Sequence, residues 1–340
     1  MNVLNKPFDL RTRPAPETID SIDSGKLLQR VSENRQPLVI KNFASHWPMV
    51  KQAQESTKDV AKHLSTFQTG KNLKLVRLPS ETSGRMFYRD DLRGMNFDVS
   101  AQPIQQCIDK MLDEQDTARY CVQCVDVKTA FPTLEKYFDN PLLPNISPFI
   151  WIGNGIRVAA HFDEADNIAV VAAGNRRFTL FPPEQIHNLY IGPLDYTPAG
   201  QAISLVDMHQ PDLVKHPKYE EAFNHALSVE LEPGDAIFIP TPWWHHVESL
   251  STFNVLVNYW WSNNQTTSQL PFPMLMHGLQ ALKNMHPQEK HAWQHMIKHY
   301  LLEEFGDPAE HIPEQAKGIM GQPNAKISQM IHQWLASQIK

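Results

Sequence analysis

The sequence predicts a mainly β protein with flanking helices, in which the strands close into a barrel or a sandwich. Short apolar runs follow one another at close spacing between residues 119 and 262, and Pro, Gly and Asp residues separate them. This pattern favours a barrel or sandwich over a layout of alternating strands and helices. Residues 263–340 then change to helical periodicity. The chain has 340 residues, which is long enough to bury a sizeable core in one large domain or two.

Residues 1–118 carry a mixture of helical and short extended signals. The apolar run PLVI at residues 37–40 predicts a buried strand, after which the chain turns into a helix. Farther along, Ile104, Ile108 and Leu112 recur at every fourth position, which predicts a helix around them. We therefore expect residues 1–118 to form a mixed region that packs on the barrel.

The strand signals of residues 119–262 are bracketed by turn residues, as in an all-β domain. The run EPGDAIFIP contains a Pro-Gly-Asp turn that leads into a strand, which is typical of a hairpin. Candidate strands occupy residues 120–125, 149–154, 158–163, 167–174, 176–183, 226–233, 235–241, 245–250 and 253–261. We expect this region to form one β domain.

Residues 263–340 predict a helical region, with candidate helices over residues 275–285, 291–305 and 324–339. Met296, Tyr300 and Phe305 suit the apolar face of an amphipathic helix. Such a face at the end of a domain needs a partner, which is a second copy of the chain or its own barrel. The histidines at positions 291, 295 and 299 share one helical face, but no carboxylate lies in register with them, so we interpret them as a polar face.

The composition argues against several classes of partner. The net charge is −6 and the pI is about 6.2, which disfavours general electrostatic binding to nucleic acid or to an anionic membrane. The N-terminus lacks the apolar run of a signal peptide, and no stretch is long and apolar enough to span a bilayer. Three cysteines without an export signal indicate a reducing compartment. We expect a cytoplasmic protein that does not bind membranes.

Cys121 and Cys124 form a CxxC pair, which raises the question of a redox or zinc site. The pair lies in a predicted strand, where residues three apart point to opposite faces. A structural zinc site also needs four ligands, and the chain has no second CxxC. We therefore expect packed and unreactive thiols.

The segment HFDEADN at residues 161–167 places a histidine and a carboxylate two positions apart in a sheet-like context. On a strand, His161 and Asp163 would share one face. A third ligand for a metal ion comes later in the chain, from the WWHH run that holds His245 and His246. Two histidines and one carboxylate form the facial triad that leaves open positions on iron(II) for a co-substrate and dioxygen. Because consecutive strand residues face opposite ways, only one of the two histidines can point inward, and periodicity does not decide which.

Four runs, HFDEADN, GNRRFTLFPPEQ, EPGDAIFIPTPWWHHVES and NVLVNYWW, occur in an order that resembles the JmjC and cupin-8 hydroxylases. The likeness is closest to the asparaginyl hydroxylase that inhibits hypoxia-inducible factor. The bacterial cupin-8 proteins and the JmjC enzyme that hydroxylates wybutosine in tRNA are also similar. The likeness is good over residues 119–262, and it is looser over the N-terminal third, where PLVIKNFASHWP and GRMFYRDDLRGMNF carry it.

This resemblance implies a double-stranded β-helix, the jelly roll of the cupins, with Fe(II), 2-oxoglutarate as co-substrate and O2. By the same resemblance, His161, Asp163 and His245 bind the iron, and His246 faces outward. The basic residue fifteen positions after the first ligand, here Arg176, grips the far carboxylate of 2-oxoglutarate. The closest relative has lysine there, but a guanidinium can also hold a carboxylate through two hydrogen bonds.

The resemblance also assigns roles to three other polar residues. Tyr120 corresponds to a tyrosine that binds the same carboxylate, and Asn167 and Asn258 correspond to asparagines near the iron and the other end of the co-substrate. One position departs from the family, which often has threonine three residues before the first histidine, whereas this chain has Val158. One hydrogen bond to the co-substrate is therefore missing or comes from another residue.

The function that the resemblance implies is hydroxylation of a protein side chain, with succinate and CO2 as co-products. Within the enzymes, the alternative is hydroxylation of a tRNA base or a small molecule. Outside them, the alternatives are a metal-binding cupin without oxygenase activity and a catalytically silent scaffold. The C-terminal helices are expected to form a homodimer, as they do in the family.

Overall fold

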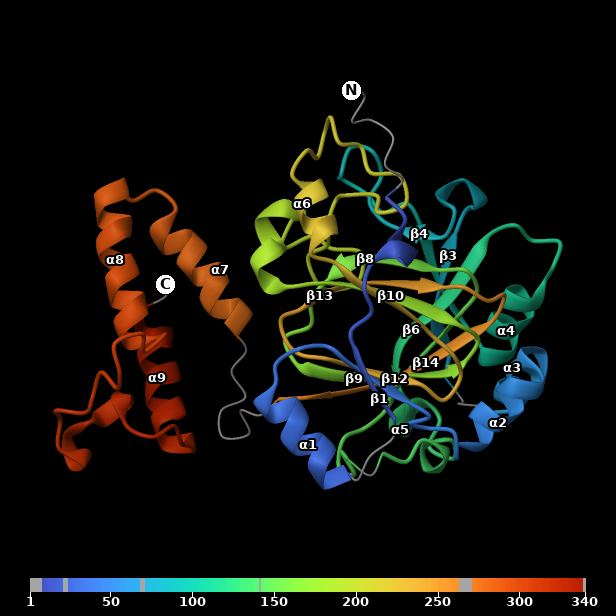
Figure 1. The fold of residues 1–340 in the computed structure, drawn as a ribbon, viewed down its shortest axis with the longest axis horizontal. Coiled ribbons are helices and arrows are strands. Elements are labelled where there is room, and N and C mark those ends of the chain that lie inside the picture. Colours follow the sequence, from blue (N-terminus) through green and yellow to red (C-terminus); the bar gives the residue numbers. More distant parts are fainter. Residues whose placement is uncertain (1–7, 21–23, 68–70, 141, 263–270, 339–340) are drawn as a thin grey trace. The chain divides into compact units, whose positions relative to one another are not determined.

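Strands β7 to β14 form two sheets, and successive strands change sheet at every step except from β10 to β11, as the computed structural model shows for residues 8–20, 24–67, 71–140, 142–262 and 271–338 (Figure 1). One sheet holds the order β12-β9-β14-β7, and the other holds β11-β10-β13-β8. The strands are β7 Phe149–Gly153, β8 Arg157–His161, β9 Asp166–Ala173, β10 Arg176–Phe181, β11 Leu227–Leu231, β12 Ala236–Ile239, β13 Trp244–Ser249 and β14 Asn254–Trp261. This is a double-stranded β-helix, and the predicted fold class is confirmed.

Strands from the first third of the chain extend the larger sheet on both edges. β1 (Glu17–Asp20) and β2 (Leu38–Lys41) add to β12, and β6 (Arg119–Asp126), β3 (Leu73–Leu78) and β5 (Asp98–Gln102) add to β7. The short β4 (Arg85–Met86) pairs with β8 in the smaller sheet. The sequence patterns predicted β2 and β6, whereas β1, β3 and β5 show no clear alternation of their own and depend on their neighbours in the sheet.

Two apolar layers follow from this arrangement, one between the sheets and one on the other face of the larger sheet. The inner layer includes Ala169, Val171, Phe178, Leu180, Val247 and Leu256. The outer layer includes Ile168, Val170 and Ala172, and the helices α2 (Pro48–Glu55), α3 (Thr57–Ser65) and α4 (Ile104–Leu112) pack there. Both faces of β9 are therefore buried, which explains its continuous apolar run. Ala169 and Val171 of β9 face the inner layer, where a ligand site can form.

The first unit, Met1–Trp261, is followed by a second, Ser262–Lys340, which is helical. It contains α7 (Pro271–Leu282), α8 (Pro287–Tyr300) and α9 (Ala325–Gln338). Large apolar side chains are exposed on it: Met274, Leu275, Met276, Leu279, Trp293, Met296, Tyr300, Leu301, Leu302, Phe305, Ile319, Met320, Met330 and Trp334. None of the helices in the described ranges has the length and apolar character that crossing a membrane requires.

The two cysteines of the CxxC pair have different surroundings, and only one of them is the packed thiol that the sequence predicted. Cys121 is buried, and burial raises its pKa to about 12. Cys107 is also buried, which raises its pKa to about 11. Cys124 is exposed and lies at a register shift of β6 between Val122 and Val125, with a φ of 47°. Burial and the charge of Asp163 raise its pKa. The prediction of packed thiols therefore holds for two cysteines and is wrong for Cys124.

Candidate metal centre

Three predicted ligands converge at the mouth of the inner layer. His161 is the last residue of β8 and lies opposite His245 of β13, with 4.3 Å between the ring centroids. Asp163 lies two residues beyond the end of β8, and its Oδ2 is 3.7 Å from Nε2 of His245. One side-chain atom from each of these three residues falls within 4.8 Å of the other two. Asp163 is therefore brought in by the loop after the strand, and not by the strand periodicity that the sequence suggested.

The register of the smaller sheet decides which histidine of the WWHH run points inward. His245 is opposite His161 and Leu180, and Leu180 belongs to the inner layer. His246 is opposite Thr179 and points to the other face. A register shift between His245 and Val247 adds one residue to β8, so His161 and Val158 both face inward although they are three apart.

The surroundings keep the two imidazoles ready to bind a cation. Nδ1 of His161 lies 2.9 Å from the Ala159 carbonyl oxygen, and Nδ1 of His245 lies 3.1 Å from that of Trp243. A proton on Nδ1 satisfies each carbonyl and leaves Nε2 as the ligand atom. Burial first, and then the charge of His161, lower the pKa of His245 to about 4. The ring of His245 is therefore neutral near pH 7, which is the form that binds a metal.

A short chain of hydrogen bonds orients the Asp163 carboxylate. Trp260 Nε1 and Asn167 Nδ2 both donate to Oδ2 of Asp163, at 2.9 and 3.1 Å. Asn258 Nδ2 donates in turn to Oδ1 of Asn167 at 3.0 Å. The two predicted asparagines thus lie at the site, and Oδ1 of Asn258 is buried without a hydrogen-bond partner among the described residues. The sequence did not predict the role of Trp260, because an indole within an aromatic run does not indicate which acceptor its N–H will meet.

The loop that carries Asp163 is anchored to the loop before β13. Thr241 Oγ1 donates to the Asp163 carbonyl oxygen at 2.6 Å, and the Thr241 amide donates to Oδ1 of Asp166 at 3.0 Å. Arg35 forms an ion pair with the buried Asp166, with 2.7 Å between its Nη1 and Oδ2. These contacts fix the loop that carries Asp163 relative to the loop that leads to His245.

Arg176 is buried in the inner layer, and the residues that the structure describes give it no anionic partner within ion-pair distance. It begins β10 on the same face as Phe178 and Leu180, and it is 7% exposed. Its Nε has no hydrogen-bond partner in the described ranges. Burial lowers the pKa of Arg176 to about 10, so the guanidinium is still charged near pH 7. Leu180, opposite His245, is four residues along β10, which puts the Arg176 backbone roughly 13 Å from the triad.

The turn before Arg176 explains how its position is fixed. Gly174 has a φ of +68°, a conformation that other residues rarely adopt. A Cβ atom there would lie 2.4 Å from the Phe253 carbonyl oxygen, so the turn and β14 approach closely. Hydrogen bonds from the Asn175 amide to Ser251 Oγ and from the Leu250 amide to the Asn175 carbonyl close the turn. The backbone before Arg176 is therefore held in one conformation, which fixes where its side chain starts in the inner layer.

Trp151 is a further residue of the inner layer that the sequence did not reveal. It lies on β7 opposite Leu256 and packs against both the inner layer and the cluster that holds Cys121 and Val158. Its Nε1 is buried without a hydrogen-bond partner among the described residues. Val158, the departure from the family pattern, pairs with Val247 and offers no side-chain hydrogen bond. A signal that could have pointed to Trp151 is its position within FIWIG, where one polar N–H interrupts an apolar strand.

Tyr120 is not brought to this group. Its ring belongs to the outer layer, and its hydroxyl donates to Asp116 Oδ2 at 2.5 Å. Its neighbour Cys121 faces the other way, where the charge of Arg176 acts on it. The strand period of two therefore assigns Cys121, and not Tyr120, to the side of Arg176.

The residues present fit both groups that the sequence implied. Two imidazoles and one oriented carboxylate are donors that iron(II) accepts. A buried guanidinium and an indole N–H without partners fit the carboxylate of a small dianion.

Comparison with known proteins agrees with this geometry. A family model described as a cupin-like domain matches residues 25–267. Human "HSPB1-associated protein 1" is 32% identical over 150 residues, which is 42% of this chain and 30% of that protein. "Lysine-specific demethylase JMJ31" of Arabidopsis thaliana is 34% identical over 108 residues, 32% of this chain and 19% of that protein. Chicken "tRNA wybutosine-synthesizing protein 5" is 24% identical over 279 residues, 75% of this chain and 80% of that protein. The chain thus spans less than a third of the length of the first two relatives.

Proposed function

The chain belongs to the cupin-like, JmjC-type domain family, and from this membership we propose that it is an Fe(II)- and 2-oxoglutarate-dependent dioxygenase that hydroxylates a protein side chain. The observation that carries the proposal is the buried, unpaired Arg176 on the same inner face as the triad. A buried charge without a partner costs several kcal/mol of stability, at about the level of a broken buried ion pair. An anionic co-substrate that enters the inner layer removes this cost, because its carboxylate pairs with the guanidinium.

The residues of the site divide the work of such a reaction. His161, Asp163 and His245 would hold the metal ion, and a set of three protein ligands leaves positions for a co-substrate and dioxygen. Bound iron(II) supplies the redox chemistry by which O2 is reduced while 2-oxoglutarate is oxidised to succinate and CO2. Trp260 and Asn167 hold the Asp163 carboxylate in a fixed orientation through their hydrogen bonds. The fixed orientation of the Asp163 carboxylate would therefore fix where the metal ion is held.

Arg176 binds the far carboxylate of the co-substrate in this proposal. Its backbone stands roughly 13 Å from the triad along β10, a distance that one arginine side chain and a five-carbon dicarboxylate cover together. The guanidinium donates two parallel hydrogen bonds to one carboxylate, which fixes the direction of the ligand as well as its position. The Trp151 N–H takes the place of the hydroxyl that Val158 lacks. Asn258 stands at the metal end through its link to Asn167.

The choice of a protein substrate follows from charge and from the relatives. A net charge of −6 disfavours a polyanionic substrate such as tRNA. One relative is named as a lysine-specific demethylase, which is a protein-modifying activity. A tRNA base is the second candidate, because the chain covers 80% of the chicken wybutosine-synthesizing protein. A metal-binding cupin without oxygenase activity is the third, and it predicts no response to 2-oxoglutarate.

The protein is further proposed to be a cytoplasmic homodimer. The second unit exposes large apolar side chains on α7, α8 and α9, including Trp293 and Trp334. Exposed apolar area of this kind is usually covered by a partner. A second copy of the same chain is the partner that a symmetric dimer provides.

The experiment that tests the proposed function is anaerobic. The protein is loaded with Fe(II), 2-oxoglutarate is added, and the weak visible charge-transfer band of a keto acid chelated to iron is measured. The band should appear in the wild type, vanish in His161→Ala and weaken in Arg176→Ala. Arg177→Gln is the matched control, because its side chain points to the other face of β10 and should leave the band unchanged.

The outcomes separate the candidate functions. If iron binds but 2-oxoglutarate produces no band, the proposed dioxygenase activity is wrong, and a metal-binding cupin without oxygenase activity is the proposal that remains. If the band forms, succinate release is measured with peptide and tRNA pools in turn. Stimulation by tRNA and not by peptides would overturn the protein substrate.

A further inference from the structure

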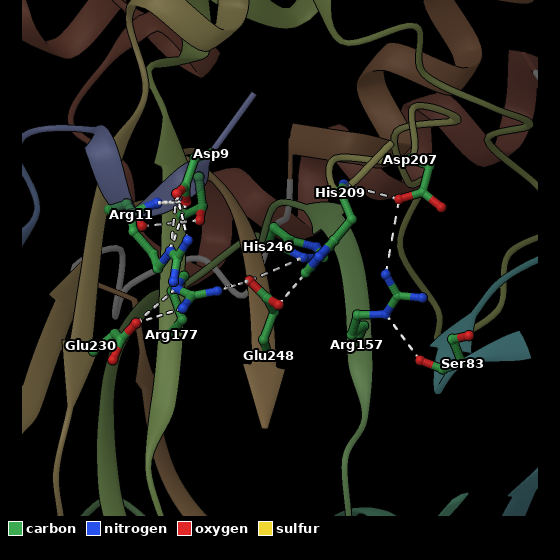
Figure 2. A network of polar contacts seen from close by, with 12 residues as sticks. Asp9, Arg11, Ser83, Arg157, Arg177, Asp207, His209, Glu230, His246 and Glu248 are labelled. Carbon is green, nitrogen blue, oxygen red and sulfur yellow. Dashed lines mark hydrogen bonds and ion pairs between the residues drawn. The ribbon is translucent and has the colours of Figure 1, made fainter. Parts of the chain in front are cut away.

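A second group of two histidines and one carboxylate lies on the outer face of β13, behind the metal centre. This outer cluster consists of His209, His246 and Glu248, whose ligand atoms all lie within 4.8 Å of one another. His246 and Glu248 are two apart on β13, so they share the face opposite to His245. His209 reaches them from the segment between η5 (Pro183–Asn188) and α6 (Tyr219–Asn224), as Figure 2 shows.

His246 is a buried imidazole whose nitrogens are both unsatisfied. It is 5% exposed, and neither ring nitrogen has a hydrogen-bond partner in the described part of the chain. Its Nε2 lies 3.8 Å from Glu248 Oε2, which is too long for a hydrogen bond. Buried polar groups in native proteins are almost always satisfied, so an exception calls for a missing partner.

Glu248 supplies the negative charge of the outer cluster. It is 3% exposed, and its two oxygens have different partners. Oε1 lies 2.6 Å from His209 Nε2, and Oε2 accepts a hydrogen bond from Arg177 Nη1 at 3.2 Å. Burial alone would raise the pKa of Glu248, but the hydrogen bond with His209 and the surrounding charges lower it to about 2. The carboxylate is therefore ionised, with Oε2 anchored by an arginine and Oε1 directed at His209.

The arginines beside the outer cluster do not exclude a cation, because each also contacts a carboxylate outside the cluster. Arg177 Nη2 lies 2.5 Å from Glu230 Oε1 on the neighbouring strand β11. Arg157 on β8 has Asp207 at 4.0 Å. The outer cluster thus offers two imidazoles and one carboxylate, which are the same donor types as in the inner site. Figure 2 shows the three side chains of the outer cluster close to one another.

We propose that the outer cluster is a second metal site that binds zinc through His209, His246 and Glu248, with water in the fourth position. Zinc bonds to nitrogen and oxygen are about 2.0–2.2 Å, so the ligand atoms of a tetrahedral site lie roughly 3.3 Å apart. The ligand atoms of the outer cluster already lie within 4.8 Å of one another, so small movements suffice. Zinc also binds such donors more tightly than iron(II) does.

His209 gives the site both its freedom to adjust and its access to solvent. Its side chain is 36% exposed, whereas those of His246 and Glu248 are nearly buried. A surface cavity of about 420 Å³, lined by residues that include Arg11, Arg177 and His209, adjoins it and has room for the water ligand.

The ion would join the segment around His209 to β13. Because His245 and His246 are neighbours on this strand, an ion on the outer face also stiffens the backbone that directs His245 inward. This second site stands on its own contacts and does not depend on the proposed dioxygenase activity.

The test measures metal stoichiometry in a full-length variant that has lost the inner site. His161→Ala and Asp163→Ala remove two inner ligands. His295→Ala is added because Nε2 of His295 lies 3.4 Å from Nε2 of His291 on α8, where a stray ion could bind. The chelator-treated protein is titrated with Zn(II), and with Co(II) to observe the visible bands of a tetrahedral site. We expect one equivalent to bind and the thermal unfolding midpoint to rise with metal.

Variants of the outer cluster decide the assignment. Adding His209→Ala, or Glu248→Gln, should weaken binding at least a hundredfold and abolish the Co(II) bands. His46→Ala is the matched control, because His46 is also an exposed histidine that contacts a carboxylate, Asp139, at 3.0 Å. The proposal is overturned if the background variant binds no equivalent, or if His209→Ala binds as tightly as His46→Ala. Circular dichroism of the metal-free proteins verifies that each variant is folded.

Discussion

Neighbouring residues of the same type have opposite surroundings at two places in the smaller sheet. His245 and His246 point to opposite faces of β13, and Arg176 and Arg177 point to opposite faces of β10. The inner arginine has no anionic partner, whereas the outer arginine is held by Glu230 and Glu248. The face of the sheet to which a side chain points therefore decides what it can bind, although the two neighbours are of the same type. For the two arginines, a substitution of the outer one can serve as the control for a substitution of the inner one.

Arg176→Met should stabilise the ligand-free protein and remove co-substrate binding. The substitution replaces a buried unpaired charge with an apolar side chain of similar length, so the thermal unfolding midpoint should rise. The guanidinium donates two hydrogen bonds in this proposal, and each contributes about 1.5–3 kcal/mol, so 2-oxoglutarate should bind at least roughly a hundredfold more weakly. Arg177→Met removes a paired arginine and should lower the midpoint without changing binding. Calorimetry and thermal unfolding measure both quantities, and unchanged affinity in Arg176→Met would contradict the assignment.

Trp151→Phe should weaken 2-oxoglutarate binding about threefold to tenfold, because one neutral hydrogen bond contributes about 0.5–1.5 kcal/mol. The ligand-free protein should lose no stability beyond that of a smaller ring, since Nε1 has no partner to lose among the described residues. Trp243→Phe is the control, because Trp243 Nε1 donates to the Arg35 carbonyl oxygen at 3.2 Å. That variant should lose stability and keep its affinity. Equal affinity in the two variants would remove Trp151 from the site.

At the scale of elements, the site depends on two loops that join strands of different sheets. The loop after β8 carries Asp163 and leads into Asp166, the first residue of β9, and the loop before β13 carries Thr241. Asp166 connects both to Arg35, which precedes β2. A substitution that breaks these contacts should alter the metal site although no ligand is replaced, because the backbone that carries Asp163 would move.

Asp166→Asn should weaken iron(II) binding about tenfold, at the lower end of the range for residues that orient metal ligands. The amide keeps the size of the side chain but loses the ion pair with Arg35. Asp235→Asn is the control, because Asp235 is equally buried and pairs with Lys41 at the other end of β12. Both variants should lose stability, as a thermal melt would show, but only Asp166→Asn should lose iron affinity in an anaerobic titration. Equal losses of affinity would mean that the effect is general destabilisation.

At the scale of the whole molecule, the chain divides its tasks between two units. Met1–Trp261 holds the sheets and both groups of ligands, and Ser262–Lys340 holds the exposed apolar helices. The apolar core of the first unit is built from its own residues. Folding and metal binding should therefore belong to the first unit, and self-association to the second.

A chain that ends at Trp261 should fold, bind iron and be monomeric, whereas the full chain should be a dimer. Light scattering after size exclusion measures the mass of each. Trp334→Glu should dissociate the full chain, because Trp334 is 63% exposed on α9 and charge opposes burial in an interface. Val214→Glu, at a 90% exposed position of the first unit, should leave the dimer intact. A monomeric full chain would contradict the homodimer.

Local patterns predicted much of the fold and part of the site. The apolar runs of β7 to β14 are bounded by Pro, Gly and Asp, so their strands could be recognised one at a time. β1, β3 and β5 could not, since their pairing with β2, β6 and β3, respectively, supplies what their own sequences lack. The spacing of His161 and Asp163 indicated a pair of ligands, although the loop after β8 and not the strand brings them together.

The sequence by itself determined the kinds of ligand and the alternation of neighbours. Tertiary structure decided which neighbour faces inward, because a period of two sets relative directions only, and the packing of one sheet on the other sets the absolute direction. For this reason His245 joins the inner site, Tyr120 turns to the outer layer and Trp151 joins Arg176. The outer cluster also depends on tertiary structure, since His209 meets β13 through a long connection whose path no local pattern encodes.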